Sequence, residues 1–152
     1  MTSSVLFDFE MIVSDAADAV RTILADRMLR VSLQGDDSLG TEQDLVARWC
    51  QPSQSRHAAR LRASGRIVGA ISREGGMLSY FIARSEWRRG YGTALVEQYL
   101  RQTSLPTSPL RARVARGNLA SRRILQRLDF VECGLEWRDR CLAPAVVYLE
   151  SK

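Results

Sequence analysis

The sequence is almost free of lysine and histidine, because Lys152 is its one lysine and His57 its one histidine. A phosphate-binding P-loop needs a lysine directly after its second glycine, and no glycine of this chain precedes a lysine. The three cysteines, Cys50, Cys133 and Cys141, have spacings that fit no zinc pattern. We therefore expect no P-loop and no metal, and we interpret the cysteines as reduced thiols of a cytoplasmic protein.

Long apolar runs are also missing. No stretch approaches 18 apolar residues, so we expect no membrane span. The first five residues lack the basic start and apolar stretch of a secretory signal. With 152 residues, 45% of them hydrophobic and 26% charged, the chain has the composition of a globular domain with a proper core. We expect one domain over residues 1–152, as a monomer or a homodimer.

The net charge of +5 is unevenly distributed. Residues 1–50 hold four arginines and nine acidic residues, which gives −5, whereas the remainder holds 18 basic and 8 acidic residues, which gives +10. A basic body suits a polyanion, either nucleic acid or a phosphorylated cofactor, and an acidic third suits a cation. Because no aromatic-interleaved or helix-turn-helix pattern accompanies the arginines, nucleic-acid binding is disfavoured.

Hydrophobic periodicity and turn residues predict a mixed α/β fold. In the first third we expect an edge strand at 5–11 and then a helix capped by Ser14 or Asp15. One face of this helix would carry Val20, Ile23, Leu24 and Met28. A loop at 33–40 and a short helix that begins at Thr41 would follow. An antiparallel meander follows, with strands at 57–62, 67–71 and 77–82. The remainder predicts a helix after Gly90, a strand at 110–115, a helix capped by Asn118, and strands near 131–135 and 145–149.

The most informative stretch, residues 80–100, begins as an apolar strand and ends as a helix. Its junction is Arg88-Arg89-Gly90-Tyr91-Gly92-Thr93. The two glycines allow a backbone to approach a ligand closely, and a helix start offers unpaired N–H groups to an anion. The two arginines add donors suited to phosphate. We predict that this turn binds a pyrophosphate, and the alternative is a turn that binds no ligand. A dinucleotide-binding fingerprint is disfavoured, because Leu95 stands where that motif needs its third glycine.

Two motifs in order resemble the GCN5-related N-acetyltransferases. Trp87-Arg88-Arg89-Gly90-Tyr91-Gly92 resembles the coenzyme A loop Gln/Arg-x-x-Gly-x-Gly/Ala, with tryptophan in the first place. Residues 113–130 resemble the second half of the family core, a strand followed by Asn-x-x-Ser and a helix that ends in Leu-Gly-Phe. Asn-x-Ala-Ser-Arg-Arg-x-Leu and the tryptophan look like the branch that acetylates N-termini of ribosomal proteins. The resemblance covers roughly residues 57–150.

The resemblance implies a twisted mixed sheet of six to seven strands with about four helices on its faces. It implies transfer of an acetyl group from acetyl-CoA to a primary amine of a small molecule or a peptide N-terminus, by direct attack in a ternary complex. Residues 1–50 would form the acceptor side and residues 57–150 the acetyl-CoA-binding core. The implied cofactor-binding residues are Phe81, Ile82, Ala83, Arg88, Arg89, Gly90, Tyr91, Gly92, Thr93, Asn118 and Ser121.

Ser121 is the predicted catalytic residue, because the resemblance places it near the thioester sulfur. The residues alone give each a structural explanation that is equally good: Asn118 can be a helix cap, and Ser121 can be an ordinary residue of the first helical turn. Leu125 stands where many members have a tyrosine, and Met77 stands where some have a glutamate, so no catalytic base is evident. Asp129 replaces the glycine of Leu-Gly-Phe and must adopt a left-handed conformation. A non-catalytic acyl-CoA-binding or regulatory domain is therefore the alternative.

The charge pattern predicts the acceptor. In the resembled family the first helices and their loop roof the acceptor side, and here they carry the excess of −5. We expect a cationic acceptor, either a polyamine-like molecule or a basic peptide N-terminus, steered by Asp36, Asp37, Glu42 and Asp44. An α-amine, with a pKa of ~8, needs less help from a base than a lysine-like amine at ~10.4. We expect no catalytic role for His57 or the cysteines.

Overall fold

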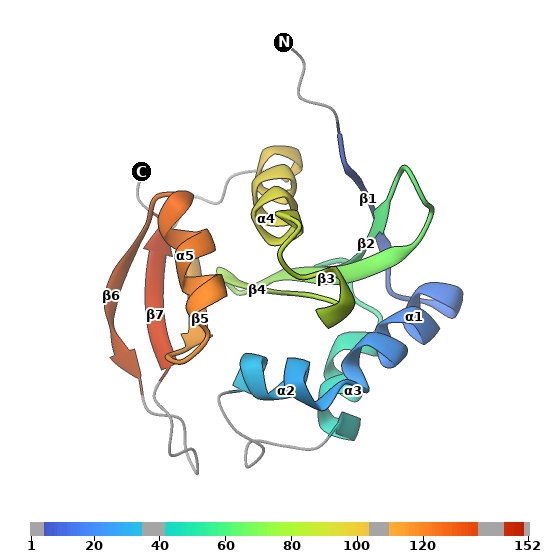
Figure 1. Ribbon diagram of the computed structural model, residues 1–152, viewed down its shortest axis with the longest axis horizontal. Coiled ribbons are helices and arrows are strands. Elements are labelled where there is room, and N and C mark those ends of the chain that lie inside the picture. The colour runs from blue at the N-terminus through green and yellow to red at the C-terminus, as the bar shows by residue number, and fades with distance from the viewer. Residues whose placement is uncertain (1–4, 35–41, 104–109, 137–144, 151–152) are drawn as a thin grey trace.

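A mixed seven-stranded sheet, in the order β1-β2-β3-β4-β5-β7-β6, forms the centre of the protein (Figure 1). The structure is a computed structural model that describes residues 5–34, 42–103, 110–136 and 145–150. The strands are β1 (Phe7–Met11), β2 (Arg56–Leu61), β3 (Ile67–Glu74), β4 (Met77–Ile82), β5 (Arg111–Ala115), β6 (Phe130–Glu136) and β7 (Ala145–Glu150). The helices are α1 (Ser14–Leu24), α2 (Arg27–Gln34), α3 (Glu42–Cys50), α4 (Tyr91–Gln102) and α5 (Leu119–Arg127), with a short 3-10 turn, η2 (Arg84–Glu86).

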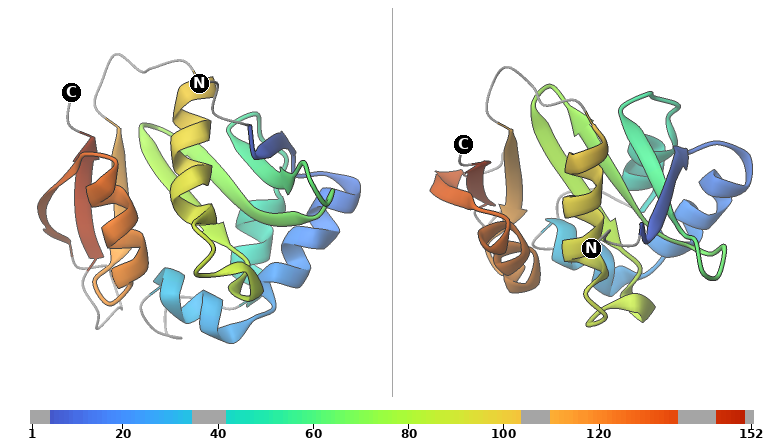
Figure 2. Two further views of the ribbon diagram at one scale, coloured as in Figure 1. Left: turned by 45° about the horizontal axis from the view of Figure 1, so that its top comes forward. Right: turned by 90° about the horizontal axis from the view of Figure 1, so that it is seen from above.

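The sheet has one parallel pairing, and it is short. Strands β1 to β4 pair in antiparallel fashion, and so do β5 with β7 and β7 with β6. Strand β4 pairs with β5 in parallel only at Met77–Arg111 and Leu78–Ala112. Beyond these pairs β4 turns away from β5, and Figure 2 shows the green strands diverging from the orange ones. The sheet is therefore open along the second half of β4.

Two hydrophobic clusters fill the two faces of the sheet. Helices α4 and α5 cover one face, where Leu95, Val96 and Leu125 pack with apolar strand residues. Helices α1, α2 and α3 cover the other face, where Val20 and Leu24 pack with residues that include Leu29 and Trp49. Strand β3 contributes to both clusters, as its apolar sequence predicted for a central strand. In the described part of the chain, no helix has both the length and the apolarity that crossing a membrane requires.

The predicted sheet and the order of its strands are confirmed, but the helices of the first third differ from the prediction. The first helix ends at Leu24, and a separate helix, α2, runs over Arg27–Gln34. Asp26 interrupts the apolar period, because its Oδ1 accepts the Leu29 N–H at 3.2 Å and so caps the new helix. Met28 is consequently 57% exposed and does not share the buried face of α1. The described residues thus hold five α-helices where about four were predicted.

Smaller predictions have mixed outcomes. Neither Ser14 nor Asp15 is the N-cap of α1; Val13 occupies that place, and Ser14 is the first residue of the helix, with a φ of +51°. Two residues of the predicted loop at 33–40 belong to α2, and the others lie outside the described residues, as does Thr41. Asp129 adopts a φ of +67°, so the left-handed turn predicted for Leu-Asp-Phe is confirmed.

A buried glutamine connects α4 to the edge strand. The Oε1 of Gln98 accepts the N–H groups of Leu6 and Phe7, each at 3.0 Å, and its Nε2 donates to the Phe7 carbonyl at 2.6 Å. The Gln98 residue is only 9% exposed, so these backbone groups have little access to water. The side-chain amide thus replaces a neighbouring strand at the start of β1 and fixes α4 on the sheet.

We expect Gln98→Met to lower the free energy of unfolding by about 1–3 kcal/mol, because it leaves buried backbone groups of the edge strand unpaired. Urea denaturation measures this loss, and hydrogen exchange should show faster exchange at Leu6 and Phe7. Gln102→Met makes the same chemical change at an exposed position of α4 and is the matched control. Equal stability of the two variants would contradict the role assigned to Gln98.

Candidate active site

The opening beside β4 exposes backbone groups to a ligand. The Ala83 N–H donates to the Val68 carbonyl at 2.7 Å, and Phe81 is paired with Ala70, so both residues direct their backbone toward β3. Because hydrogen-bonding direction alternates along a strand, Tyr80 and Ile82 direct theirs toward the opening. Of the predicted stretch Phe81–Ala83, only Ile82 therefore directs main-chain groups toward the opening, and Tyr80, which was not predicted, does so too. The indole N–H of Trp87 donates to the Ile82 carbonyl at 2.8 Å.

The start of α4 lies at one end of this opening. Gly90 is its N-cap, with a φ of +79° that favours glycine, and no side chain caps the helix. The first bond of the helix runs from Ala94 N to Gly90 O at 3.2 Å, so the N–H groups of Tyr91, Gly92 and Thr93 have no intrahelical acceptor. Three such donors at the positive end of a helix dipole are a favourable arrangement for an anion.

The turn before α4 is strained and held by ion pairs. Arg88 has a φ of +66°, a conformation that costs a non-glycine residue about 1–3 kcal/mol. Glu86, whose side chain is 4% exposed, binds Arg66 Nη2 through Oε1 at 2.7 Å. Its Oε2 lies 3.5 Å from Arg89 Nε and accepts no hydrogen bond in the described structure. Glu86 thus fixes the turn, and one of its oxygens retains an unused acceptor position.

The start of α5 faces that of α4. Asn118 caps α5 as predicted, because its Oδ1 accepts the Ser121 N–H at 3.2 Å. A Cβ on Gly92 would lie only 2.6 Å from Ile124 Cδ1, so glycine at this position lets the two helices approach closely. The two helix starts therefore converge on one space beside the opening in the sheet.

Tyr80 was not predicted to belong to the site. Its Oη lies 2.5 Å from Ser121 Oγ, so a hydrogen bond joins β4 to the first turn of α5. Leu125, where many relatives have a tyrosine, is fully buried in the core. The sequence carried one usable signal, which is a tyrosine on the strand directly before the predicted cradle. Tyr80 places a phenol near Ser121 although none stands at position 125.

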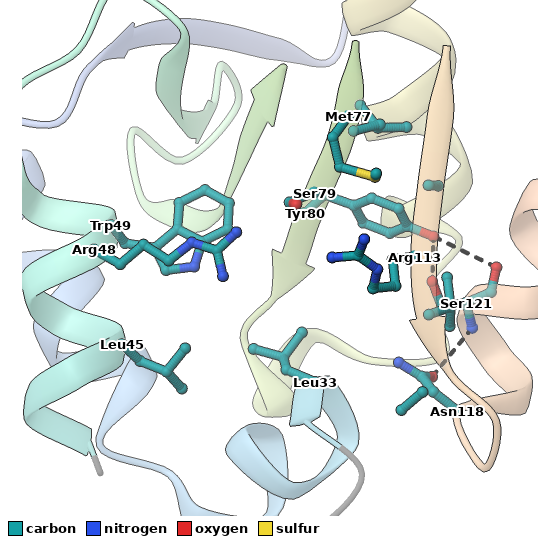
Figure 3. Close-up of a pocket in the computed structure, with 14 residues that line it drawn as sticks. Leu33, Leu45, Arg48, Trp49, Met77, Ser79, Tyr80, Arg113, Asn118 and Ser121 are labelled. Carbon is teal, nitrogen blue, oxygen red and sulfur yellow. Dashed lines mark hydrogen bonds between the residues drawn. The ribbon is translucent and has the colours of Figure 1, made fainter. Parts of the chain in front are cut away.

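Two cavities meet at this hydrogen bond. The larger cavity, of about 650 Å³, lies along the starts of α4 and α5. The smaller cavity, of about 350 Å³, lies on the side of α2 and α3. Leu33, Tyr80, Asn118 and Ser121 line both of them. Figure 3 shows Ser121 and Asn118 at one edge of the smaller cavity, with the Tyr80 ring directed toward them. A molecule in each cavity would reach the other at the Tyr80–Ser121 pair.

Most of the predicted cofactor-binding residues surround the larger cavity. Those that line it are Phe81, Ile82, Arg88, Gly90, Tyr91, Gly92, Thr93, Asn118 and Ser121. Ala83 and Arg89 do not, because Ala83 bonds to β3 and Arg89 is turned to Glu86. Arg123 and Arg127 of α5 line the cavity and were not predicted. Their spacing of four residues on a predicted helix would have placed them on one face.

The smaller cavity combines apolar walls with two arginines. Leu45 and Trp49 come from α3, Leu33 from α2 and Met77 from β4. Trp49 also packs edge-on against Phe81, with ring centroids 4.9 Å apart, which ties α3 to the sheet. Arg48 and Arg113 line the same cavity, and Figure 3 shows their guanidinium groups directed toward each other across it.

The residues that we expected to be structural lie away from both cavities. His57 lies with Nδ1 3.4 Å from the Tyr99 hydroxyl, and burial lowers the pKa of this histidine. Burial also raises the pKa of the Cys50 thiol, which disfavours a thiolate. Cys133 is exposed, and Cys141 lies outside the described residues. Within the described ranges, no group of three or more His, Cys, Asp or Glu side chains could hold a metal ion.

The acidic residues expected to steer the acceptor are only partly described. Asp36 and Asp37 fall in the stretch for which the structure gives no placement. Glu42 lies 3.6 Å from Arg30, and Glu42 and Asp44 belong to the first turn of α3. Neither residue lines the smaller cavity, and no acidic residue does among those described.

Comparisons with known proteins bear on the whole chain. Residues 10–131 match a family model described as an acetyltransferase (GNAT) domain. A GNAT-family acetyltransferase structure from Bacillus anthracis has a TM-score of 0.74 at 13% identity, covering 97% of this chain and 95% of that chain. Spermidine N-acetyltransferase from Vibrio cholerae, solved with CoA and spermine, has a TM-score of 0.72 at 12% identity, covering 97% of each chain.

The ribosomal L7/L12 alpha-N-protein acetyltransferase RimL, in an apo crystal form, has a TM-score of 0.67 at 14% identity. That match covers 96% of this chain and 90% of RimL. No curated protein sequence matches the chain. At these identities the solved structures establish only the fold. The family model covers most of the chain, because it reaches from the end of β1 into β6.

Proposed function

The chain belongs to the GNAT acetyltransferase family, and from this premise we propose that it transfers an acetyl group from acetyl-CoA to a primary amine. The amine belongs to a small molecule or a peptide N-terminus and attacks directly in a ternary complex. One observation carries the proposal: two cavities of different character meet at the Tyr80–Ser121 hydrogen bond. The matched structures include enzymes named for both kinds of amine, spermidine and a ribosomal protein N-terminus.

The larger cavity suits coenzyme A. Its pyrophosphate would accept hydrogen bonds from the N–H groups of Tyr91, Gly92 and Thr93 at the start of α4. Three exposed arginines that line the cavity, Arg88, Arg123 and Arg127, supply positive charge for the phosphates. The backbone of Tyr80 and Ile82 faces the opening, where an extended amide-bearing arm can pair with a strand. Acetyl-CoA, when bound, supplies an acetyl thioester.

The smaller cavity would hold the amine acceptor. Leu33, Leu45, Arg48 and Trp49 of α2 and α3 form one wall, and residues of β4, β5 and the start of α5 form the rest. The acceptor side would therefore be built from both parts of the predicted division, 1–50 and 57–150. Neither Cys50 nor Cys133 lines either cavity, so among the described residues no thiol stands where a covalent acetyl carrier would be needed. This arrangement favours direct attack by the amine.

Ser121 and Tyr80 would hold the proton that the departing sulfur takes up. At 2.5 Å, one hydroxyl donates to the other, and the Tyr80 hydroxyl also lies 3.5 Å from the Ser121 carbonyl oxygen. Asn118 binds the Ser121 N–H and thereby fixes this residue at the junction of the cavities. We therefore assign the predicted role of Ser121 to a pair of hydroxyl groups, in which Tyr80 orients and supports the serine.

Thiol release in the presence of candidate amines tests the function. Purified protein is mixed with acetyl-CoA and a panel of small amines and peptides, and free coenzyme A and the acetylated amine are measured. We expect amine-dependent release with an equal amount of N-acetylated product. Tight binding of acetyl-CoA without release for any amine would contradict transferase activity and favour a non-catalytic acyl-CoA-binding domain.

Gly92→Ala tests the cradle at the start of α4. The added methyl group occupies the cavity beside the helix N–H groups, and we expect it to weaken coenzyme A binding about 10- to 100-fold. Because this methyl also contacts Ile124 Cδ1, the control is the double variant Gly92→Ala/Ile124→Val, which removes that atom. Calorimetry should show weak binding in both variants. Full affinity in the double variant would show that Gly92 serves helix packing alone.

Ser121→Ala and Tyr80→Phe test the hydroxyl pair. We expect each to lower kcat about 100-fold with little change in the KM for acetyl-CoA, because the proton is needed mainly in the transition state. If the two hydroxyls act as a unit, the double variant should be no slower than the slower single variant. Tyr99→Phe removes a tyrosine hydroxyl outside both cavities and is the control. An unchanged kcat in Ser121→Ala, with chemistry rate-limiting, would eliminate this role.

A further inference from the structure

The arginines of the larger cavity lie on two separate elements. Arg88 comes from the turn before α4, and Arg123 and Arg127 come from α5. Building on the proposed function, we infer that Arg123 and Arg127 bind the 3′-phosphate of coenzyme A, whereas Arg88 and the start of α4 bind its pyrophosphate. The protein would thereby distinguish coenzyme A from 3′-dephospho-coenzyme A. The inference names the two residues that determine this specificity and adds to the transfer reaction proposed above.

One side of α5 faces the larger cavity. A stripe along this helix lines the cavity, with positions i, i+3, i+4 and i+7 on one helix face, and it consists of Ala120, Arg123, Ile124 and Arg127. Arg122 lies off this stripe, because its Nη2 is 3.5 Å from the Glu132 carboxylate and its Nη1 donates to the Arg116 carbonyl at 3.0 Å. Of the three arginines of α5, Arg123 and Arg127 are therefore the two that a ligand in this cavity can reach.

Both side chains are available to a ligand. Arg123 and Arg127 are exposed, and neither has an ion pair or a hydrogen bond with a residue that the structure describes. Glu86 is the one acidic residue among the described residues that line the cavity, and its carboxylate is held by Arg66 and Arg89 in the turn before α4. An anion beside α5 would therefore gain two guanidinium partners without breaking an ion pair between described residues.

Helix α5 runs beside α4 (Figure 1), and the order of residues along it matches the order of groups in the cofactor. Ser121, in the first turn, stands where the two cavities meet and where the thioester would lie. One turn further, Ile124 lies beside Gly92 at the start of α4, because a Cβ on that glycine would be 2.6 Å from Ile124 Cδ1. Arg127 follows after about one more turn, roughly 4.5 Å along the helix axis. Coenzyme A has the same order, since its sulfur, pantetheine arm and pyrophosphate are followed by the ribose with its 3′-phosphate.

The two places suit two different phosphate groups. At the start of α4, the three N–H groups of residues 91–93 and the Arg88 side chain suit the pyrophosphate. A phosphate monoester carries a charge of about −1.5 to −2 at pH 7 and offers three acceptor oxygens. Guanidinium groups on neighbouring turns of one helix can donate to such a group from the same side. The 3′-phosphate is the phosphate monoester of coenzyme A, so α5 carries the donors that this group requires.

Two matched ligands test the inference directly. Coenzyme A and 3′-dephospho-coenzyme A differ only in the 3′-phosphate, and calorimetry with each ligand in the absence of an amine requires no turnover. We expect the protein to bind coenzyme A about 10-fold more tightly than the dephospho form at low salt. The preference should shrink at high salt, because salt screens exposed charges. Equal affinity for the two ligands at low salt would overturn the inference.

Variants identify the residues. We expect Arg123→Gln and Arg127→Gln each to weaken coenzyme A binding about 3-fold, because each removes one exposed charged partner of the phosphate. The double variant should bind coenzyme A and the dephospho form with nearly equal affinity, and the affinity for the dephospho form should stay close to that of the wild type. Arg88→Gln should instead weaken the binding of both ligands by the same factor, because both carry the pyrophosphate.

Arg122→Gln is the matched control. It removes the same charge from the same helix, at a side chain that is directed to Glu132 and lines neither cavity. The preference for coenzyme A should survive in this variant. If Arg122→Gln lowered the preference as much as Arg127→Gln does, only the net charge of the helix would matter, and the assignment of the 3′-phosphate to Arg123 and Arg127 would be wrong.

The same ligands separate this inference from the proposed function. Acetyl transfer from acetyl-CoA and from its 3′-dephospho form with equal kcat/KM, together with equal binding, would refute the 3′-phosphate site and leave the transferase activity standing. The expected binding preference without transfer to any amine would support the site, and the proposed function alone would fail. Failure to bind either ligand would contradict the assignment of the larger cavity to coenzyme A and would overturn both proposals.

Discussion

The site depends on the early end of the pairing between β4 and β5. Two parallel pairs hold these strands together, and beyond Leu78 and Ala112 the sheet is open. Full pairing would bury the backbone of Tyr80 and Ile82 in a ladder, and the space shared by the two cavities would be filled. Because the strands part, the sheet connects its two faces, with the starts of α4 and α5 on one side and α2 and α3 on the other. An open sheet of this kind suits two reactants that must meet from opposite sides.

An open sheet needs other contacts to keep its shape. Gln98 fixes α4 to the edge strand through three hydrogen bonds, and Glu86 holds the turn before that helix through two arginines. The left-handed Arg88 and the close contact of Gly92 with α5 are tolerated because these contacts determine the path of the chain. Strain and a buried carboxylate oxygen without a hydrogen bond occur together in this turn, and such features cluster at functional sites.

Much of this arrangement could be predicted from local patterns. The strands, the helix start at Gly90 and the Asn118 cap each depend on a few neighbouring residues, and the structure places them as expected. The boundary between α1 and α2 was missed because Asp26 caps a helix inside a continuous apolar period. Tyr80 and the pair Arg48–Arg113 were missed for another reason. In each case residues more than 40 positions apart come to the same place, and only the strand separation and the side on which each residue lies bring them there.

The charge of the acceptor is the property that local sequence patterns predict least well. Counted along the chain, the first third is acidic, and that count favours a cation. Counted around the smaller cavity, the described charges are two arginines, one from the acidic third and one from the basic body. Electrostatic attraction at contact depends on distance and burial, whereas the net charge of a segment acts only through a screened field. The net charge of residues 1–50 therefore does not by itself select the group that binds in the smaller cavity, because the walls of that cavity come from both parts of the chain.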